Sequence, residues 1–208
     1  MSTEIELKAH VSSIEALKQT LTEGGRYLSY FEKDDSLWFP VDKPPGKESP
    51  GPAPGLPAKR LPATGLRIRR EKRRFPDGTE ETFTFVTYKN KEIRDGIEVN
   101  EEKEFEIRSS EGQGALVFED LLTRLQLQPG SGKRKRGWAF SINGITAELL
   151  ELESLGWFLE LEILADNDRA ETVSEGRNRL LELLAGLGIG KEAIEDRPYM
   201  QMLGDVKY

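Results

Sequence analysis

The chain has 208 residues, of which 32% are charged and 37% hydrophobic, and its formal net charge is −7. It contains no cysteine and one histidine, His10. These counts exclude a disulfide scaffold, a thiolate nucleophile and a Cys/His zinc site. No apolar run reaches the ~18–20 residues of a membrane span, and no signal-peptide pattern follows Met1. We therefore expect a soluble, cytoplasmic protein with a single domain.

Period-two alternation predicts strands, and apolar residues at helical spacing predict helices. In chain order we expect a strand at 3–9, a helix at 13–23, a strand at 26–39 with a charged interruption at 33–35, a hairpin of 65–73 and 80–89, a strand at 97–107, a helix at 114–127, a hairpin of 133–142 and 145–152, a strand at 157–164, and helices at 170–186 and 191–196. About eight hairpin-connected strands predict an antiparallel α+β domain, and closure into a barrel removes their exposed edges.

A stretch at about 40–62 differs from the rest of the chain. Eight of the eleven prolines lie in it, together with three glycines. A strand cannot accommodate that density of proline, so we expect a flexible insertion rather than a domain boundary.

Charged residues recur at i, i+2 spacing on one face of several predicted strands. The acidic set is Glu4, Glu6, Glu102, Glu104, Glu106, Glu160 and Glu162, and the basic set is Lys8, Arg67, Arg69, Lys89, Lys133, Arg134, Lys135 and Arg136. Such faces can simply contact solvent. Like charges on neighbouring strands are unfavourable, however, unless groups of opposite sign lie between them.

A barrel whose apolar faces point outward under helices, and whose charged faces line a lumen, accounts better for this pattern. Paired carboxylates are suited to chelate a hard cation such as Mg²⁺ or Mn²⁺, and Lys and Arg are suited to a polyanion. Together these groups suit a phosphate chain. Outward packing of Trp138 and Phe140 turns Lys133 and Lys135 inward. Lys89 shares its parity with two phenylalanines, so a bulge or a partly apolar lumen end is expected.

The ordered motifs of the chain resemble those of the CYTH superfamily, the triphosphate tunnel metalloenzymes. The resemblance covers nearly all of the chain except the proline-rich stretch. Its motifs are Glu4-Ile5-Glu6-Leu7-Lys8, Lys33-Asp34-Asp35, Leu66-Arg67-Ile68-Arg69-Arg70, Thr87-Tyr88-Lys89, the glutamates at 102, 104 and 106, the basic strand at 133–136, Leu155-Gly156-Trp157-Phe158-Leu159-Glu160-Leu161-Glu162, and Arg197-Pro198-Tyr199.

The resemblance implies an eight-stranded antiparallel barrel that forms a tunnel, with helices outside. It implies metal ligation by Glu4, Glu6, Glu160 and Glu162, and triphosphate binding by Lys8, Arg67, Arg69, Lys89 and the cations at 133–136. Glu102, Glu104 and Glu106 are additional candidates. Lys8, Glu4 and Glu6 are the candidate catalytic residues, although no general base is identified.

The segment before Glu160 is most similar to the class IV adenylyl cyclase branch, which converts ATP to cyclic AMP and pyrophosphate. A triphosphatase that hydrolyses tripolyphosphate, thiamine triphosphate or a nucleoside triphosphate is the alternative, and an inactive polyphosphate-binding or nucleotide-binding module is a third. The expected partner is a small triphosphate, with no membrane, and the protein is expected to be a monomer or homodimer. The negative net charge argues against a nucleic-acid partner.

Overall fold

The computed structural model describes residues 3–41, 66–94, 97–108 and 113–204. Their elements are β1 (Thr3–His10), α1 (Ile14–Gly24), β2 (Arg26–Pro40), β3 (Leu66–Arg74), β4 (Glu80–Arg94), β5 (Ile97–Glu106), α2 (Gln113–Arg124), β6 (Leu127–Ile142), β7 (Ile145–Leu152), β8 (Gly156–Ala165), α3 (Ala170–Gly186), a 3₁₀ turn at Lys191–Ala193 and α4 (Tyr199–Met202).

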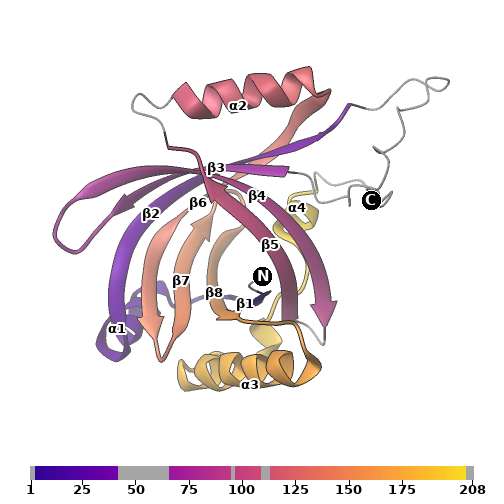
Figure 1. Ribbon diagram of the computed structural model, residues 1–208. Helices are drawn as coiled ribbons and strands as arrows, with labels where there is room; N and C mark the ends of the chain where they lie inside the picture. Colours follow the sequence, from indigo (N-terminus) through magenta and orange to yellow (C-terminus); the bar gives the residue numbers. More distant parts are fainter. Residues whose placement is uncertain (1–2, 42–65, 95–96, 109–112, 205–208) are drawn as a thin grey trace.

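The eight strands form one closed antiparallel barrel in the order β1-β5-β4-β3-β2-β6-β7-β8, as the strand pattern predicted. Helices α1 and α3 lie against one side of the barrel, and α2 crosses the opposite side (Figure 1). The fold is therefore α+β with the helices outside. None of the helices in the described part of the chain is long and apolar enough to cross a membrane.

The apolar core lies mainly outside the barrel wall, under the helices. The odd-numbered residues of β1, Ile5, Leu7 and Ala9, are fully buried with Leu180 and Leu184 of α3. A smaller outer cluster lies under α2 and contains Trp38, Ile68, Val86 and Leu122. Because strand side chains alternate between faces, this outward packing turns the even-numbered glutamates of β1 inward.

The interior is charged over only part of its length. Where β7 ends and β8 begins, an apolar cluster fills it, formed by Phe31, Ala139, Leu150, Leu152, Phe158 and Tyr199. Glu148 of β7 is followed on the same face by Leu150 and Leu152. The expectation of a charged tunnel therefore needs this correction, because strand parity predicts which side chains face inward but not where they change from polar to apolar.

Several predicted boundaries also change. The Lys33-Asp34-Asp35 run does not interrupt its strand, because β2 continues through it and pairs on both sides with β3 and β6. The segment 191–196 contains only a 3₁₀ turn, and α4 was not predicted. The proline-rich stretch lies outside the described residues apart from Pro40 and Val41.

A close approach between β6 and β7 gives one stability prediction. A Cβ at Gly137 would overlap the carbonyl oxygen of Leu149 and lie 2.7 Å from the Cα of Leu150, both backbone atoms. Since backbone cannot yield as a flexible side chain does, we expect Gly137→Ala to lower the free energy of unfolding by about 1–3 kcal/mol in urea titrations. Gly24→Ala, which meets no atom within 4 Å, is the control and should not destabilise. Equal effects of the two variants would contradict this packing.

Candidate functional site

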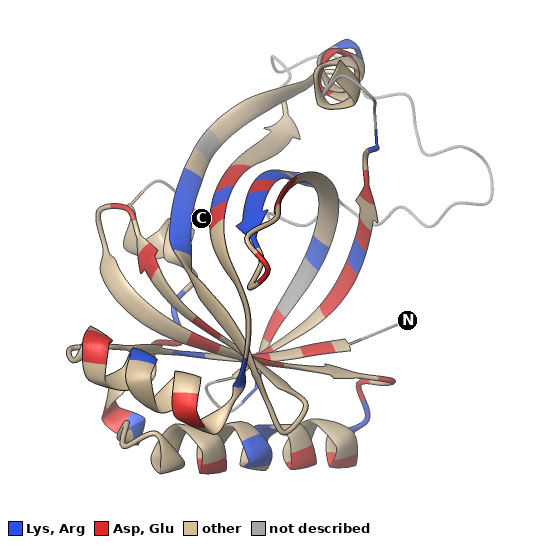
Figure 2. Ribbon diagram, turned by 90° about the vertical axis from the view of Figure 1, so that its left-hand side faces the viewer, with Lys and Arg blue, Asp and Glu red and all other residues tan. Residues whose placement is uncertain are grey.

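A cavity of about 290 Å³ lies inside the barrel and is lined almost entirely by charged side chains. Among the described residues that line it are nine glutamates and seven cations. The glutamates are Glu4, Glu6, Glu71, Glu98, Glu102, Glu104, Glu148, Glu160 and Glu162, and the cations are Lys33, Arg67, Arg69, Arg73, Lys89, Lys133 and Lys135. Blue and red segments accordingly alternate along the curved strands in Figure 2.

The strand register places like charges opposite one another in the wall of this cavity. Glu6 lies opposite Glu98 of β5 and Glu162 of β8, and Lys33 lies opposite Lys135. Directly opposed like charges are destabilising. Lys33 also lies opposite Glu71 of β3, whereas Glu6 needs a countercharge from elsewhere in the barrel.

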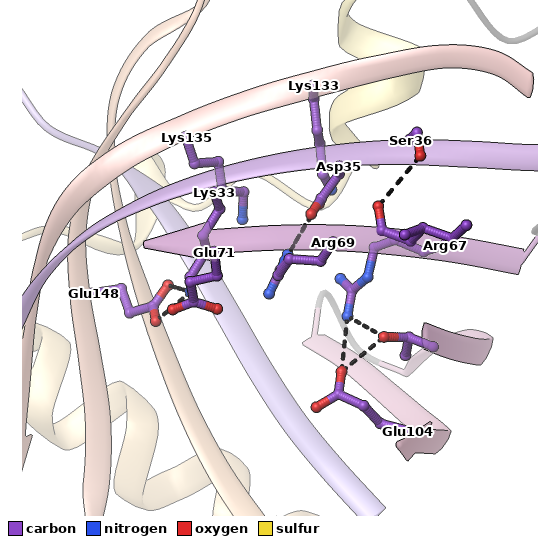
Figure 3. A network of polar contacts seen from close by, with 12 residues as sticks. Lys33, Asp35, Ser36, Arg67, Arg69, Glu71, Glu104, Lys133, Lys135 and Glu148 are labelled. Carbon is purple, nitrogen blue, oxygen red and sulfur yellow. Dashed lines mark hydrogen bonds and ion pairs between the residues drawn. The ribbon is translucent and has the colours of Figure 1, made fainter. Parts of the chain in front are cut away.

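Countercharges also come across the interior from strands that are not neighbours. Lys33 of β2 donates to both carboxylate oxygens of Glu148 on β7, at 2.6 and 2.7 Å (Figure 3). Lys135 of β6 donates to both oxygens of Glu160 on β8, at 2.6 and 2.8 Å. Each of these pairs spans one intervening strand, β6 in the first case and β7 in the second.

On the β4 side, Lys89 connects the two glutamates of β1. Its ammonium group contacts the carboxylate of Glu4 and lies 3.2 Å from that of Glu6. Burial alone would lower the pKa of Lys89, but the carboxylates of Glu6 and Glu4 raise it well above its ordinary value. Lys89 is therefore a cation held between two acids.

The arginines of β3 are also held in defined positions. Arg69 makes a bidentate pair with the fully buried Asp35, at 2.6 and 2.9 Å, and both side chains lie between β2 and β3 in Figure 3. Burial would raise the pKa of Asp35, but Arg69, Arg67 and Lys133 hold it well below its ordinary value. Arg67 donates to Glu102 at 3.1 Å.

The carboxylates outnumber the cations, and the electrostatics show the excess. Burial, together with the neighbouring charges of Glu6 and Glu148, raises the pKa of Glu162 to about 7 against the opposing effect of Lys89. Burial and the charges of Glu6 and Glu162 likewise raise the pKa of Glu4, against the effect of Lys89. Binding of an additional cation would therefore reduce the repulsion among the carboxylates of the cavity.

This donor set suits a hard divalent cation, which prefers carboxylate oxygens. In the described part of the chain, however, no three carboxylates converge closely enough to hold a metal ion. Lys89 lies between Glu4 and Glu6, and Lys135 occupies both oxygens of Glu160. Metal binding by these four glutamates therefore remains a prediction, and it requires these ammonium groups to move.

Most of the candidate site residues line the cavity. The face of β6 that points inward is the one predicted from the sequence. Lys133 and Lys135 face the interior, whereas Phe140 packs in the outer core. Lys89 needs no bulge, since Phe85 of the same strand also lines the cavity and makes one end partly apolar.

Four of the predicted site residues do not line the charged cavity. Arg134 and Arg136 point outward, where their side chains are 68% and 65% exposed and pair with Asp34 and Glu151. Because successive side chains of a strand point to opposite faces, Arg134 and Arg136 face outward when Lys133 and Lys135 face inward. Glu106 lies at the end of β5, pairs with Arg108 and does not line the cavity. Lys8 is 3% exposed and lies behind the cavity surface, where it donates to Glu98 at 3.2 Å.

The cavity also contains residues that the sequence reasoning did not propose, namely Lys33, Glu71, Arg73, Glu98, Glu148 and Tyr199. Extending the strand alternation would have found most of them, because Glu71 and Arg73 continue the face of Arg67 and Arg69. Tyr199 gives no such signal. Its buried ring contacts Lys135, Lys8 and Lys133, with each ammonium nitrogen 4.7–5.4 Å from the ring centre.

The chain has the fold of several solved proteins. The PH1819 protein of Pyrococcus horikoshii OT3 is 23% identical, with a TM-score of 0.70 over 96% of this chain and 97% of that one. A candidate adenylate cyclase from Vibrio parahaemolyticus is 16% identical, with a TM-score of 0.68 over 97% of each chain. HpAC1 from Hippeastrum, a candidate adenylyl cyclase described as having a dominant triphosphatase activity, is 18% identical, with a TM-score of 0.62 over 100% of this chain and 98% of that one.

These likenesses confirm the fold that the CYTH resemblance implied, including the barrel found in adenylate cyclase candidates. No family model matches the chain, and no curated protein matches it. The fold is therefore assigned by structure, while the chemistry must be argued from the residues of the cavity.

The raised pKa of Glu162 gives a pH-dependent prediction for the metal-free protein. The folded protein keeps this proton up to about pH 7, whereas the ordinary value is 4.5. Stability contributed by the protonated form is therefore present below pH 4.5 and is lost as the pH rises to about 7, by roughly 3 kcal/mol at about 1.4 kcal/mol per pKa unit.

Glu162→Gln mimics the neutral side chain and should remove this loss. In EDTA we expect the variant to be more stable than the wild type at pH 8 and equal to it at pH 4, in urea unfolding at both pH values. A difference that is the same at both pH values would contradict the assignment.

Proposed function

We propose that the chain is a divalent-metal-dependent enzyme that acts on a triphosphate inside the barrel, with conversion of ATP to cyclic AMP and pyrophosphate as its first assignment. The observation that carries the proposal is the single small cavity in which seven cations and nine glutamates of the described residues face one another. A triphosphate chain needs both direct cationic donors and neutralisation by a metal.

The cations of β3 and β6 are the proposed phosphate-binding groups. Arg67 and Arg69 present planar guanidinium groups, and Lys133 and Lys135 present ammonium groups from the adjoining part of the wall. Arg is suited to bidentate contacts with phosphate oxygens, and Lys acts as a point charge. Lys33 and Arg73 extend this set toward the β3–β4 hairpin.

Glu4, Glu6, Glu160 and Glu162 are the residues that would hold the metal. A bound Mg²⁺ or Mn²⁺ would neutralise charge on phosphate oxygens and help to orient them. The excess of carboxylates and the raised pKa of Glu162 support this role, because a cation relieves the repulsion that raises that pKa. When phosphate oxygens replace the carboxylates as partners of Lys89 and Lys135, those carboxylates are freed.

In the cyclase reaction the ribose 3′-hydroxyl attacks the α-phosphorus, a P–O bond forms, and pyrophosphate leaves as the α–β bridging bond breaks. The hydroxyl proton needs an acceptor. A water molecule, or a cavity carboxylate outside the four glutamates that would hold the metal, takes this proton. Lys89 and Lys135 are placed to neutralise the charge that develops on the leaving pyrophosphate.

A triphosphatase is the second candidate, and the likeness to HpAC1 favours it, since that protein is described as having a dominant triphosphatase activity. Here water attacks the terminal phosphorus and orthophosphate is released. The same cations and glutamates serve both reactions, because only the phosphorus that meets the nucleophile differs.

Product analysis tests the proposal. The protein is incubated with ATP and with tripolyphosphate, in Mg²⁺ and in Mn²⁺, at neutral and alkaline pH. Cyclic AMP with pyrophosphate indicates the cyclase, and orthophosphate indicates the triphosphatase; EDTA should abolish either activity. Binding without turnover under all conditions would instead indicate an inactive binding module.

The glutamates of β1 give the mutational prediction. We expect the double variant Glu4→Gln, Glu6→Gln to lose at least 100-fold in metal-dependent turnover, because the inward carboxylates of β1 are removed while the shape of the side chains is kept. The rate is measured at saturating Mg²⁺ or Mn²⁺.

Glu101→Gln, on the outer face of β5, is the matched control and should retain wild-type activity. Its side chain is 45% exposed and pairs only loosely with Lys103, at 3.7 Å. A fully active Glu4→Gln, Glu6→Gln variant would overturn the assignment of these two residues.

A further inference from the structure

A second, larger cavity adjoins the charged one at one end of the barrel. Its volume is about 790 Å³, and the two cavities share four lining residues, Glu71, Arg73, Thr146 and Glu148. It lies where β3 ends and where β2, β4 and β7 begin, and Phe31 and Ala139 of the apolar cluster form part of its lining. A volume of this size is typical of sites for small organic molecules.

The second cavity differs in chemistry from the first. Three aromatic side chains, Tyr27, Phe31 and Phe75, line it together with apolar groups and with the charged residues Arg26, Glu71, Arg73, Asp77, Glu81 and Glu148. Aromatic surface among polar groups is suited to an organic ring.

A pair of aromatic rings lies beside Arg73, which lines both cavities, and one of the two, Phe85, lines the charged cavity. Phe83 and Phe85 point inward from β4 with their rings nearly parallel, at an angle of 14° and a centroid distance of 5.8 Å. The guanidinium carbon of Arg73 lies 4.9 Å from the centre of the Phe83 ring and 5.9 Å from that of Phe85. Glu71 fixes this arginine through a 2.7 Å hydrogen bond.

Core packing does not account for these two phenylalanines. Neither belongs to any of the three apolar clusters of the described residues, and both are only half-buried. The other inward residues near the middle of β4, Thr87 and Lys89, are polar. A flat, partly exposed π surface beside a phosphate-binding cavity is a stacking site for a planar ring.

We propose that this end of the barrel binds the heteroaromatic ring of an organic triphosphate, with Phe83 and Phe85 as the stacking surface and Arg73 at the junction with the phosphate chain. The inference rests on the proposed function, since the charged cavity must hold the triphosphate for the ring to lie here. A ring site favours ring-bearing triphosphates, such as nucleoside triphosphates, as substrates over inorganic tripolyphosphate.

The contribution of the ring to binding can be distinguished from that of the phosphates with two ligands of equal charge. They are the bis-methylene analogues of ATP and of methyl triphosphate. Their P–C–P bridges resist cleavage by either proposed reaction. Both are titrated calorimetrically into the protein in Mg²⁺, using the wild type, Phe83→Leu, Phe83→Tyr and the control Phe105→Leu. Phe105 lies on β5 and is 54% exposed.

We expect the wild type to bind the ATP analogue at least tenfold more tightly than the methyl triphosphate analogue. Phe83→Leu should lower the affinity for the ATP analogue about tenfold, because the stacking of the base on the aromatic ring is lost. The same variant should change the affinity for the methyl triphosphate analogue less than twofold, because that ligand has no base. Phe83→Tyr should retain tight binding of the ATP analogue, and Phe105→Leu should leave the affinities for both ligands unchanged.

The outcomes separate the two proposals. Equal affinity for both analogues, or an ATP affinity that Phe83→Leu leaves unchanged, overturns the ring site while the triphosphate function stands. If the wild type binds neither analogue, the proposed function fails and the ring site fails with it.

Discussion

The structure depends on the neutralisation of ionised groups buried inside a barrel. An unpaired charge removed from water costs several kcal/mol, so each inward Lys, Arg and Glu needs a partner. Adjacent strands supply some of these partners, as Arg69 pairs with Asp35 and Lys8 with Glu98, but Glu6 lies opposite Glu98 and Glu162. Other partners come from strands that are not adjacent, as Lys33 pairs with Glu148 and Lys89 with Glu6. Charge pairing therefore joins strands beyond their backbone hydrogen bonds.

The same constraint explains why the interior can serve as a binding site. Every cation of the cavity that is paired with a glutamate can exchange that partner for a phosphate oxygen without leaving a bare charge. The freed carboxylates then need a cation, which a divalent metal supplies. The lowered pKa of Glu160, which Lys135 holds against the effect of burial, and the raised pKa of Glu162 show that the charge is unevenly distributed in the empty cavity. Substrate and metal would complete this balance together.

Much of the fold was predictable, because a strand records in its own sequence which face is buried. Trp138 and Phe140 share one face of β6, and Lys133 and Lys135 share the other, so local alternation predicted the inward pair correctly. The Lys33-Asp34-Asp35 run was wrongly interpreted as an interruption, because three successive charges mask the alternation. Lys33 and Asp35 are in fact inward residues of one continuous strand, whereas Asp34 pairs outside with Arg134.

The sequence by itself determined the number of strands, their hairpins and the inward faces of Glu4, Glu6, Arg67, Arg69, Glu160 and Glu162, since these follow from period-two alternation and turn chemistry. Only the tertiary structure decided which charges meet. The pairing of Lys135 with Glu160 and the position of Tyr199 among three lysines join residues from strands or segments that are not neighbours, and the contact of Lys8 with Glu98 joins two strands far apart in the sequence. Contacts across a closed barrel depend on its curvature and register, which no single strand encodes.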